Sequence, residues 1–207
     1  VKKIQGKQLS YNNYNDLLSA LAISKTFPKN TGTIIVKHSN PCGVSIHKNN
    51  LESFKSALAC DPLSAFGGIV SCNFKITKNI AKEINKIFIE VIIANGFDKN
   101  ALELLKIKKS LRIIDASNFS ANEMFKFNSI NDSFLIQSED KKIFSKNDFK
   151  IVSKKKPNKS QLENLIFAFN ISRYVKSNAI VLASNKSTIG IGSGQPSRLD
   201  SCKIAIR

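Results

Sequence analysis

The sequence has few acidic residues for its number of basic ones. Its 207 residues include 15 Asp and Glu against 32 Lys and Arg, which gives a formal net charge of +17. Such a balance favours anionic partners such as phosphates, polycarboxylates, nucleic acid or anionic lipid. The lysines are spread along the whole chain, however, and the one tight run, 154–156, is short. Zinc-finger spacings and the aromatic–basic signatures of common nucleic-acid modules are lacking, so we expect no nucleic-acid partner.

Cysteine pairs and long apolar runs are lacking as well. The four cysteines are scattered and form no C-x-x-C pair, which indicates reduced thiols in a cytoplasmic protein and predicts no metal site. No apolar run is long enough to span a bilayer and no secretory pattern opens the chain, so we expect no membrane partner. The chain starts at Val1 and stops at Arg207, directly after a well-formed motif. We therefore expect it to be an internal piece of a longer polypeptide.

Helical and strand patterns alternate along the chain. A length of 207 residues with 42% hydrophobic content suffices for a sizeable core. Strands that alternate with helices predict a layered α/β fold with a mostly parallel sheet. The patterns predict helices over 16–25, 51–60, 77–88, 101–107 and 161–174, and strands over 33–37, 69–72, 91–94, 111–115, 134–137, 149–153, 179–183 and 188–191.

The most informative stretch covers residues 33–43, TIIVKHSNPCG. It opens as a β-branched run typical of a buried strand and continues as a polar turn that contains Lys37 and His38 and is closed by a proline and a glycine. In α/β enzymes, a buried strand that ends in an acid/base pair presents catalytic groups at the edge of a sheet. An arbitrary Lys–His pair is more often a solvated strand end. The functional interpretation therefore depends on three further stretches.

These three stretches are rich in turn formers and glycine. Residues 9–13, LSYNN, contain too many turn formers to predict regular structure. Residues 61–68, DPLSAFGG, end in paired glycines, which permit either close approach of backbone to a ligand or a tight turn. Residues 191–198, IGSGQPSR, place glycines after a strand, where backbone N–H groups can face an anion. Alone, this last pattern is weak, because it matches neither the full dinucleotide fingerprint nor the P-loop.

Together with residues 175–181, VKSNAIV, these stretches resemble the transformylase region of the bifunctional purine biosynthesis family that combines AICAR transformylase with IMP cyclohydrolase. The similarity runs almost from end to end, with the motifs in the family's order. It implies a cytidine-deaminase-like layered sheet with flanking helices. Residues 1–120 would form the first deaminase-like unit, 121–160 a connecting segment with short strands, and 161–207 the truncated start of a second unit.

The resemblance implies transfer of a formyl group from 10-formyltetrahydrofolate to AICAR, the aminoimidazole carboxamide ribonucleotide, which gives FAICAR. His38 would be the proton-transfer residue and Lys37 its electrostatic partner, while Asn178 would position the reacting groups. Histidine suits proton transfer because its unperturbed pKa is about 6.5. The guanidinium of Arg198, which matches a substrate position, suits binding of a phosphate. The matched substrate-binding positions are Asn13, Phe66, Gly67, Glu90 and Arg198.

The same resemblance implies reduced folate as co-substrate, no metal, and a homodimer with sites at its interface. Flanking stretches that would hold part of the nucleotide and most of the folate lie outside these residues, so the chain alone is expected to be inactive. Two departures from the family pattern are Asn131-Asp132 in place of a double glycine, which affects a turn, and Pro196 before the last helix.

Two other functions remain open from the residues alone. One is a basic nucleic-acid-binding module without catalysis, and the other is a zinc-free, deaminase-like nucleotide-binding protein. If the family interpretation holds, Lys37, His38, Phe66 and Asn178 should gather around a common cleft despite their separation in sequence.

Overall fold

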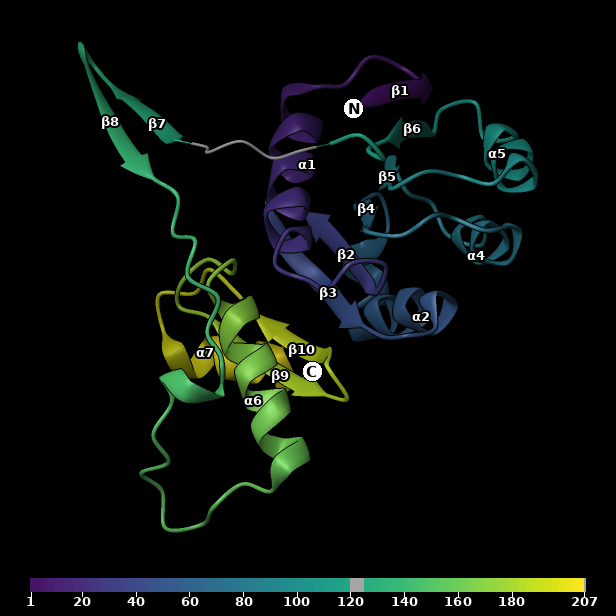
Figure 1. Cartoon of the computed structure of the whole chain (residues 1–207). Helices are drawn as coiled ribbons and strands as arrows, with labels where there is room; N and C mark the ends of the chain where they lie inside the picture. Colours follow the sequence, from purple (N-terminus) through teal and green to yellow (C-terminus); the bar gives the residue numbers. More distant parts are fainter. Residues whose placement is uncertain (120–124, 207) are drawn as a thin grey trace.

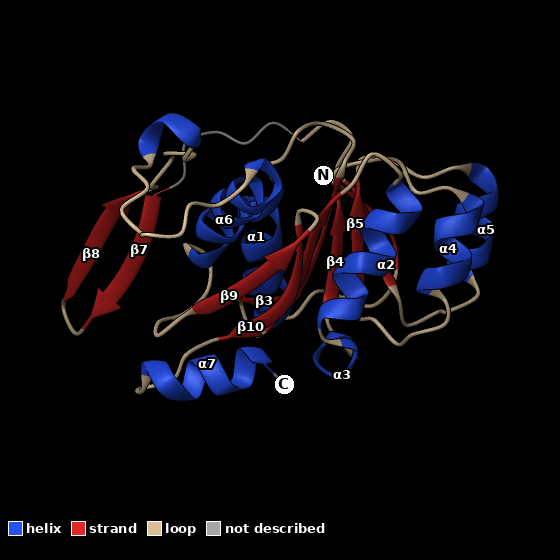
Figure 2. Cartoon of the chain, turned by 90° about the horizontal axis from the view of Figure 1, so that it is seen from below, coloured by secondary structure: helices blue, strands red, loops and turns tan. Residues whose placement is uncertain are grey.

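The computed structural model describes residues 1–119 and 125–206, which form an eight-stranded sheet with helices on both faces and a separate two-stranded hairpin (Figures 1 and 2). The order of the strands in the sheet is β1-β6-β5-β4-β2-β3-β10-β9. This architecture confirms the layered α/β fold. The strand bounds are β1 Lys2–Gln5, β2 Gly32–Lys37, β3 Asn40–Ile46, β4 Ile69–Cys72, β5 Val91–Ala94, β6 Arg112–Asp115, β7 Phe125–Ile130, β8 Ser133–Ser138, β9 Ile180–Ser184 and β10 Ser187–Gly192.

Helices cover both faces of the sheet. Their bounds are α1 Tyr11–Ser24, α2 Asn50–Cys60, α3 Pro62–Ala65, α4 Lys78–Ile84, α5 Lys99–Lys106, α6 Lys159–Ser172 and α7 Arg198–Ile206, with a 3₁₀ turn over Lys146–Asp148. Helices α1 and α6 pack on one face, while α2, α4, α5 and α7 pack on the other. Among the helices of the described residues, none combines the length and apolar character needed to cross a bilayer.

The sheet is mixed, and the expectation of a mostly parallel sheet is wrong. Strands β4, β5 and β6 are parallel to one another, whereas the other neighbouring strands of this sheet run antiparallel. Part of the cause is the chain reversal at His38 and Ser39, because a two-residue connection places β3 antiparallel to β2. Pro41 and Gly43, expected to close a turn, lie inside β3 instead.

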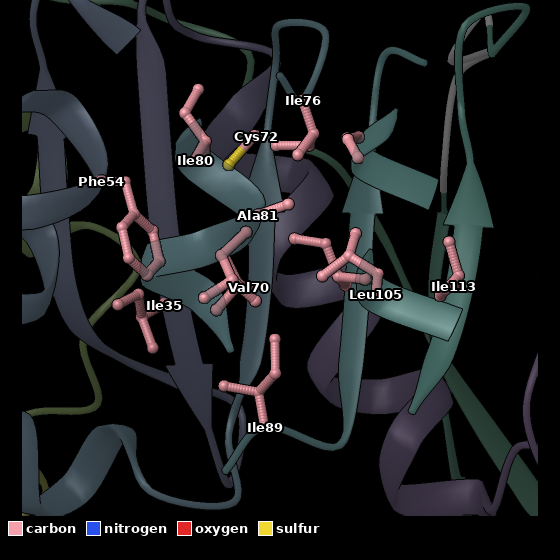
Figure 3. Packing of buried hydrophobic residues seen from close by; sticks show 14 of the residues in the cluster. Ile35, Phe54, Val70, Cys72, Ile76, Ile80, Ala81, Ile89, Leu105 and Ile113 are labelled. Carbon is pink, nitrogen blue, oxygen red and sulfur yellow. The ribbon is translucent and has the colours of Figure 1, made fainter. Parts of the chain in front are cut away.

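The core lies on both faces of the central strands. In β2, Ile34 and Val36 contact the α1 side and Ile35 contacts the opposite side, and all three are fully buried. A strand covered on both faces has a continuous apolar sequence, which explains the run recognised in the sequence. Figure 3 shows the larger cluster, in which Phe54 of α2 and Leu105 of α5 pack against the strands.

Several element boundaries differ from those expected. Helix α1 begins at Tyr11 because Ser10 and Asn13 form a capping box, so part of the stretch 9–13 is helical. Residues 149–153 form no strand. The spacing of Leu162, Leu165, Ile166 and Phe169 predicts that they form the apolar face of α6. The buried residues of this helix are instead Phe167 and Ile171, and Leu165 and Phe169 are 58% and 44% exposed. Strands β1 and β7 had no recognised signal in the sequence.

The hairpin β7–β8 stands away from the sheet and its helices (Figure 1). All of its residues are exposed, including its phenylalanines. Its turn contains Asn131-Asp132, and Asn131 adopts φ +47°, a left-handed conformation that asparagine tolerates. The turn therefore forms without the family's glycines.

The division of the chain at 120/121 lies outside the described residues, and the three-part division stays a prediction. Strands β9 and β10, which belong to the expected second unit, join the same sheet through β3.

Candidate active site

Six strands begin or end side by side along one side of the sheet, and we call this row of strand termini the site edge. Because β2 is antiparallel to β3 and β4, its end lies beside their starts. The parallel pairing of β4 with β5 brings the start of β5 to the same edge. Strand β10 is antiparallel to β3 and β9, so the end of β10 and the start of β9 join them. The segments that carry Lys37, His38, Phe66, Glu90 and Asn178 all adjoin these strand ends.

The turn between β2 and β3 holds His38. Lys37 pairs with Asn40 across the turn, and the two central residues have φ values of +53° at His38 and +61° at Ser39. This is the geometry of a type I′ turn, which normally favours glycine or asparagine. The His38 side chain is exposed, and its imidazole has no hydrogen bond within the described part of the chain. The imidazole is therefore available to a ligand.

Lys37 contacts the loop before β4. Its Nζ donates a hydrogen bond to the Phe66 carbonyl, and the Phe66 ring packs on Phe88 with centroids 5.2 Å apart. Phe66 nevertheless stays 61% exposed. Gly67 adopts φ +72° and donates its N–H to the Phe88 carbonyl at 2.8 Å. A positive φ strains residues other than glycine, so a glycine at position 67 allows the loop to adopt this conformation without strain.

A cleft of about 580 Å³ opens at the site edge. Lys37 and His38 line one wall, and the end of β10 lines another. Phe66 is joined to the cleft through its bond with Lys37, while Asn178 and Phe66 are not among the lining side chains. The lining residues are Lys37, His38, Asn40, Pro41, Cys42, Asp61, Leu63, Ser64, Ile191, Ser193 and Ile204.

Asn178 lies just before β9 and is held by the segment that follows β10. Its Nδ2 donates to the carbonyls of Gln195 and Pro196, at 2.9 and 2.8 Å. Its Oδ1 has no partner among the described residues and can accept a hydrogen bond from a ligand. A bond from the Lys176 N–H to Asn40 Oδ1, at 3.0 Å, ties this segment to the β2–β3 turn.

A second group of candidate residues surrounds Glu90. Asn13, which is buried, donates through Nδ2 to Glu90 Oε2 at 2.9 Å. Arg112 lies 3.8 Å from the same oxygen and also donates from Nε to the Gln8 carbonyl. Glu90 is thus held by a neutral donor and a cation, and its side chain stays 42% exposed. It can accept hydrogen bonds from a bound molecule.

Arg198 is the first residue of α7 and is exposed. It is not among the residues that line the cleft. Helix α7 forms despite Pro196, whose carbonyl accepts a hydrogen bond from Asn178.

The glycines of residues 190–194 serve packing and a turn. A Cβ on Gly190 would lie 1.8 Å from the Ala205 carbonyl oxygen, and one on Gly192 would lie 1.8 Å from that of Ser201. Both glycines therefore let α7 lie directly on β10. The Gly194 N–H donates to the Lys176 carbonyl at 2.7 Å. That N–H is occupied and does not face an anion, so the anion-binding interpretation of Gly194 is wrong.

Cys42 lines the cleft but carries no reactive thiolate. Burial raises the pKa of the Cys42 thiol to about 12, and the carboxylate of Asp61 adds to this shift. The thiol is therefore protonated at neutral pH. Within residues 1–119 and 125–206, no three His, Cys, Asp or Glu side chains form a group that could hold a metal ion.

Several residues that shape the site have no role that the sequence patterns indicate. Asp16 accepts the backbone N–H groups of His38 and Ser39. Arg112 supports Glu90, and Asp61 lines the cleft. The spacing of Asp16, three residues after Asn13 on one helix, is the one signal in the sequence that links it to a candidate residue.

Comparison with known proteins identifies relatives over the whole chain. The family model described as "AICARFT/IMPCHase bienzyme" matches residues 1–207. The chain is 41% identical over 208 residues to the "Bifunctional purine biosynthesis protein PurH" of Acetivibrio thermocellus, with 99% of this chain and 40% of the relative covered. It is 42% identical over 203 residues to the protein of the same name from Aquifex aeolicus, with 98% and 39% covered. The corresponding values for Leptospira biflexa are 43% over 202 residues, 97% and 39%.

The chain thus spans about two fifths of the length of the curated relatives it matches. The match to the family model covers every residue of the chain, and the identities to these relatives exceed 40%. On these grounds the chain belongs to the AICARFT/IMPCHase bienzyme family of purine biosynthesis.

Proposed function

We propose that this chain carries the formyl-transfer site of the family, where a formyl group passes from 10-formyltetrahydrofolate to the 5-amino group of AICAR to give FAICAR. The observation that supports the proposal most directly is the Lys37–His38 pair on one wall of a 580 Å³ cleft. The exposed imidazole has no partner among the described residues and is free to exchange a proton with a bound reactant.

The chemistry requires a base, a stabilised oxyanion and an acid. The amine of AICAR is a weak nucleophile, because its lone pair is delocalised into a ring that bears a carboxamide. His38 takes the amine proton as the new carbon–nitrogen bond forms. Lys37 stabilises the negative charge that develops on the formyl oxygen. The carbon–nitrogen bond to the folate then breaks, and the proton held by His38 passes to the departing folate nitrogen.

The geometry of Lys37 suits this role. Its ammonium group has three donors, and one of them is used by the Phe66 carbonyl. Two donors remain for the formyl oxygen. The bond to Phe66 also fixes the position of the ammonium group before the substrate binds, which is the preorganisation that oxyanion stabilisation needs.

The other candidate residues complete the proposed site. Asn178 accepts a hydrogen bond from the reacting amine through its free Oδ1. Asn13 and Glu90 contact the ribose or base, and the exposed Phe66 ring with Gly67 borders the substrate. Arg198 binds the phosphate, for which its guanidinium is suited. The proposal includes a homodimer with sites at its interface, as the resemblance implies.

The experiment compares His38→Ala with His47→Ala in the complete polypeptide, since these are the two histidines of the chain. His47 follows β3, at the opposite edge of the sheet, and accepts a hydrogen bond from the Asn49 N–H. We expect His38→Ala to lower the rate of formyl transfer by about 10²–10⁴ with AICAR binding retained. We expect His47→Ala to leave the rate unchanged. Release of tetrahydrofolate measures the rate.

Conversion of FAICAR to IMP provides an internal control in the same samples. Loss of that activity in His38→Ala, with formyl transfer intact, would assign the site to the second reaction of the family. Salt-dependent binding of random oligonucleotides without affinity for AICAR would favour the basic nucleic-acid module. The 207-residue chain spans about two fifths of the length of its relatives. Holding both substrates in register can supply roughly 7–11 kcal/mol of the reaction barrier. We therefore expect the chain alone, without the rest of the substrate site, to give no turnover.

A further inference from the structure

Asp16 of α1 contacts the turn that carries His38. Its Oδ2 accepts the His38 N–H at 3.1 Å, and its Oδ1 accepts the Ser39 N–H at 2.6 Å. The Ser39 hydroxyl lies 3.4 Å from the same Oδ1. Two successive N–H groups in a turn form a concavity that binds anions. Here a carboxylate of the chain itself fills it, with one oxygen for each N–H group.

The turn needs such support because of its backbone conformation. His38 and Ser39 both occupy the left-handed region, and neither is the glycine or asparagine that a type I′ turn favours. Backbone in a sparsely populated region persists when the surrounding structure holds it in place. Hydrogen bonds from N–H groups to a carboxylate are charge-assisted and stronger than neutral ones.

Helix α1 gives Asp16 a fixed position. Leu17 and Ala20 are buried against the sheet, so the helix cannot shift without loss of core contacts. The same helix carries Asn13, which donates to Glu90. One rigid element therefore fixes both the His38 turn and the Glu90 group relative to each other.

We propose that Asp16 is the positioning residue that sets the direction of the His38 side chain at the cleft. This inference rests on the proposed role of His38 in formyl transfer and adds a residue that acts through it. Asp16 hydrogen-bonds the backbone on which the imidazole is mounted, and it takes no part in the chemical step itself. A small misplacement of a reacting group costs about 10²-fold in rate, so a residue that orients a catalytic side chain affects turnover more than substrate binding.

The test uses Asp16→Asn in the complete polypeptide, with Asp98→Asn as the matched control. The amide keeps one acceptor oxygen and loses the charge, so one N–H of the turn loses its acceptor. Asp98 is a half-buried carboxylate that pairs with Lys75 at 2.8 Å and follows the far end of β5, so its replacement removes the same charge away from the turn. We expect Asp16→Asn to lower kcat for formyl transfer by about 10–100-fold and to change the KM for AICAR by less than about threefold.

A double-mutant cycle with His38→Ala tests whether Asp16 acts through His38. In that background we expect Asp16→Asn to lower the residual rate by less than about threefold, since the group it positions is absent. An equal loss in both backgrounds would overturn the proposal. So would a loss no larger than that of Asp98→Asn, or a loss confined to KM.

Amide hydrogen exchange separates this inference from the proposed reaction. We expect the peptide over residues 37–40 to exchange faster in Asp16→Asn than in the wild type, and Asp98→Asn to leave it unchanged. This result holds whether or not the wild type transfers formyl groups, so a failure of the proposed function is seen separately in the wild-type assay. Unchanged exchange in Asp16→Asn would overturn the positioning role.

Discussion

At the scale of single residues, burial decides which side chains of the site are reactive. Cys42 lines the cleft beside His38, yet it is 9% exposed and surrounded by apolar residues. Cys72, in β4, is 2% exposed. Burial raises the pKa of both thiols from 9.0 to about 12. His38, four residues before Cys42, is exposed, and its imidazole has no hydrogen bond among the described residues.

The two buried thiols should react slowly with alkylating reagents. Because the thiolate is the reactive form, we expect Cys42 and Cys72 to resist iodoacetamide at pH 8 in the folded chain and to react after unfolding in urea. Mass spectrometry of labelled peptides measures this, with the half-buried Cys202 as the internal comparison. Rapid labelling of Cys42 in folded protein would contradict the burial described here.

The pH dependence of stability follows from the same two thiols. Their folded pKa is raised, so their contribution to the free energy of unfolding is complete below about pH 9 and is lost as the pH rises towards about 12. Replacing both cysteines by alanine should weaken this alkaline loss. Urea midpoints measured between pH 8 and pH 11 would show the difference.

At the scale of elements, the contact between α7 and β10 depends on two glycines. The carbonyl of Ala205 occupies the space where a side chain at position 190 would lie. We expect Gly190→Ala to force α7 away from the strand and to lower the free energy of unfolding by about 1–3 kcal/mol or more. The neighbouring Ile189 is 58% exposed, so Ile189→Val should change it by less than about 0.5 kcal/mol. Equal effects of the two substitutions on urea unfolding would contradict this view of the packing.

Elements with strong local signals could be predicted from the sequence. Strands β4 and β5 have the expected bounds, and the strand β2 and the helix α2 lie within one residue of theirs, because apolar runs and caps are local properties. The antiparallel pairing of β2 with β3 could not be predicted, since it depends on a two-residue reversal at His38 and Ser39 that lacks glycine and asparagine. The buried face of α6 was misassigned because pairing between distant segments decides which side of a helix is covered.

The candidate site could likewise be predicted only in part from the sequence. The motifs identified Lys37, His38 and Asn178 by family resemblance, and the structure adds how each is held. Asp16 could not be identified from the sequence, because its role depends on contact between a helix and a turn 22 residues away. Gly192 and Gly194 had the pattern of a ligand loop, whereas Gly192 allows close packing of α7 and the Gly194 N–H donates to the Lys176 carbonyl.

At the scale of the whole molecule, the hairpin β7–β8 leaves apolar side chains in solvent. Phe127 and Ile136 face each other across the hairpin and are 66% and 63% exposed. We expect replacement of both by serine to reduce self-association of the 207-residue chain, because exposed apolar surface promotes association. The neighbouring polar pair Lys126 and Gln137, replaced by serine, is the matched control. Static light scattering at rising concentration measures the effect, and equal association of the two variants would contradict it.

The joining of β10 to β3 determines when the cleft comes into existence during synthesis. The Val44 N–H donates to Thr188 Oγ1 across 144 positions of the sequence, and the Lys176 N–H reaches Asn40 across 136. Contacts between such distant segments form slowly, since a long loop must close before they stabilise anything. On the ribosome, β2 to β6 can pair while β3 still lacks its outer neighbour. Until Thr188 has emerged, β3 is an unpaired outer strand of the sheet beside Lys37 and His38. Its free backbone groups are then open to chaperones or to premature pairing with another chain.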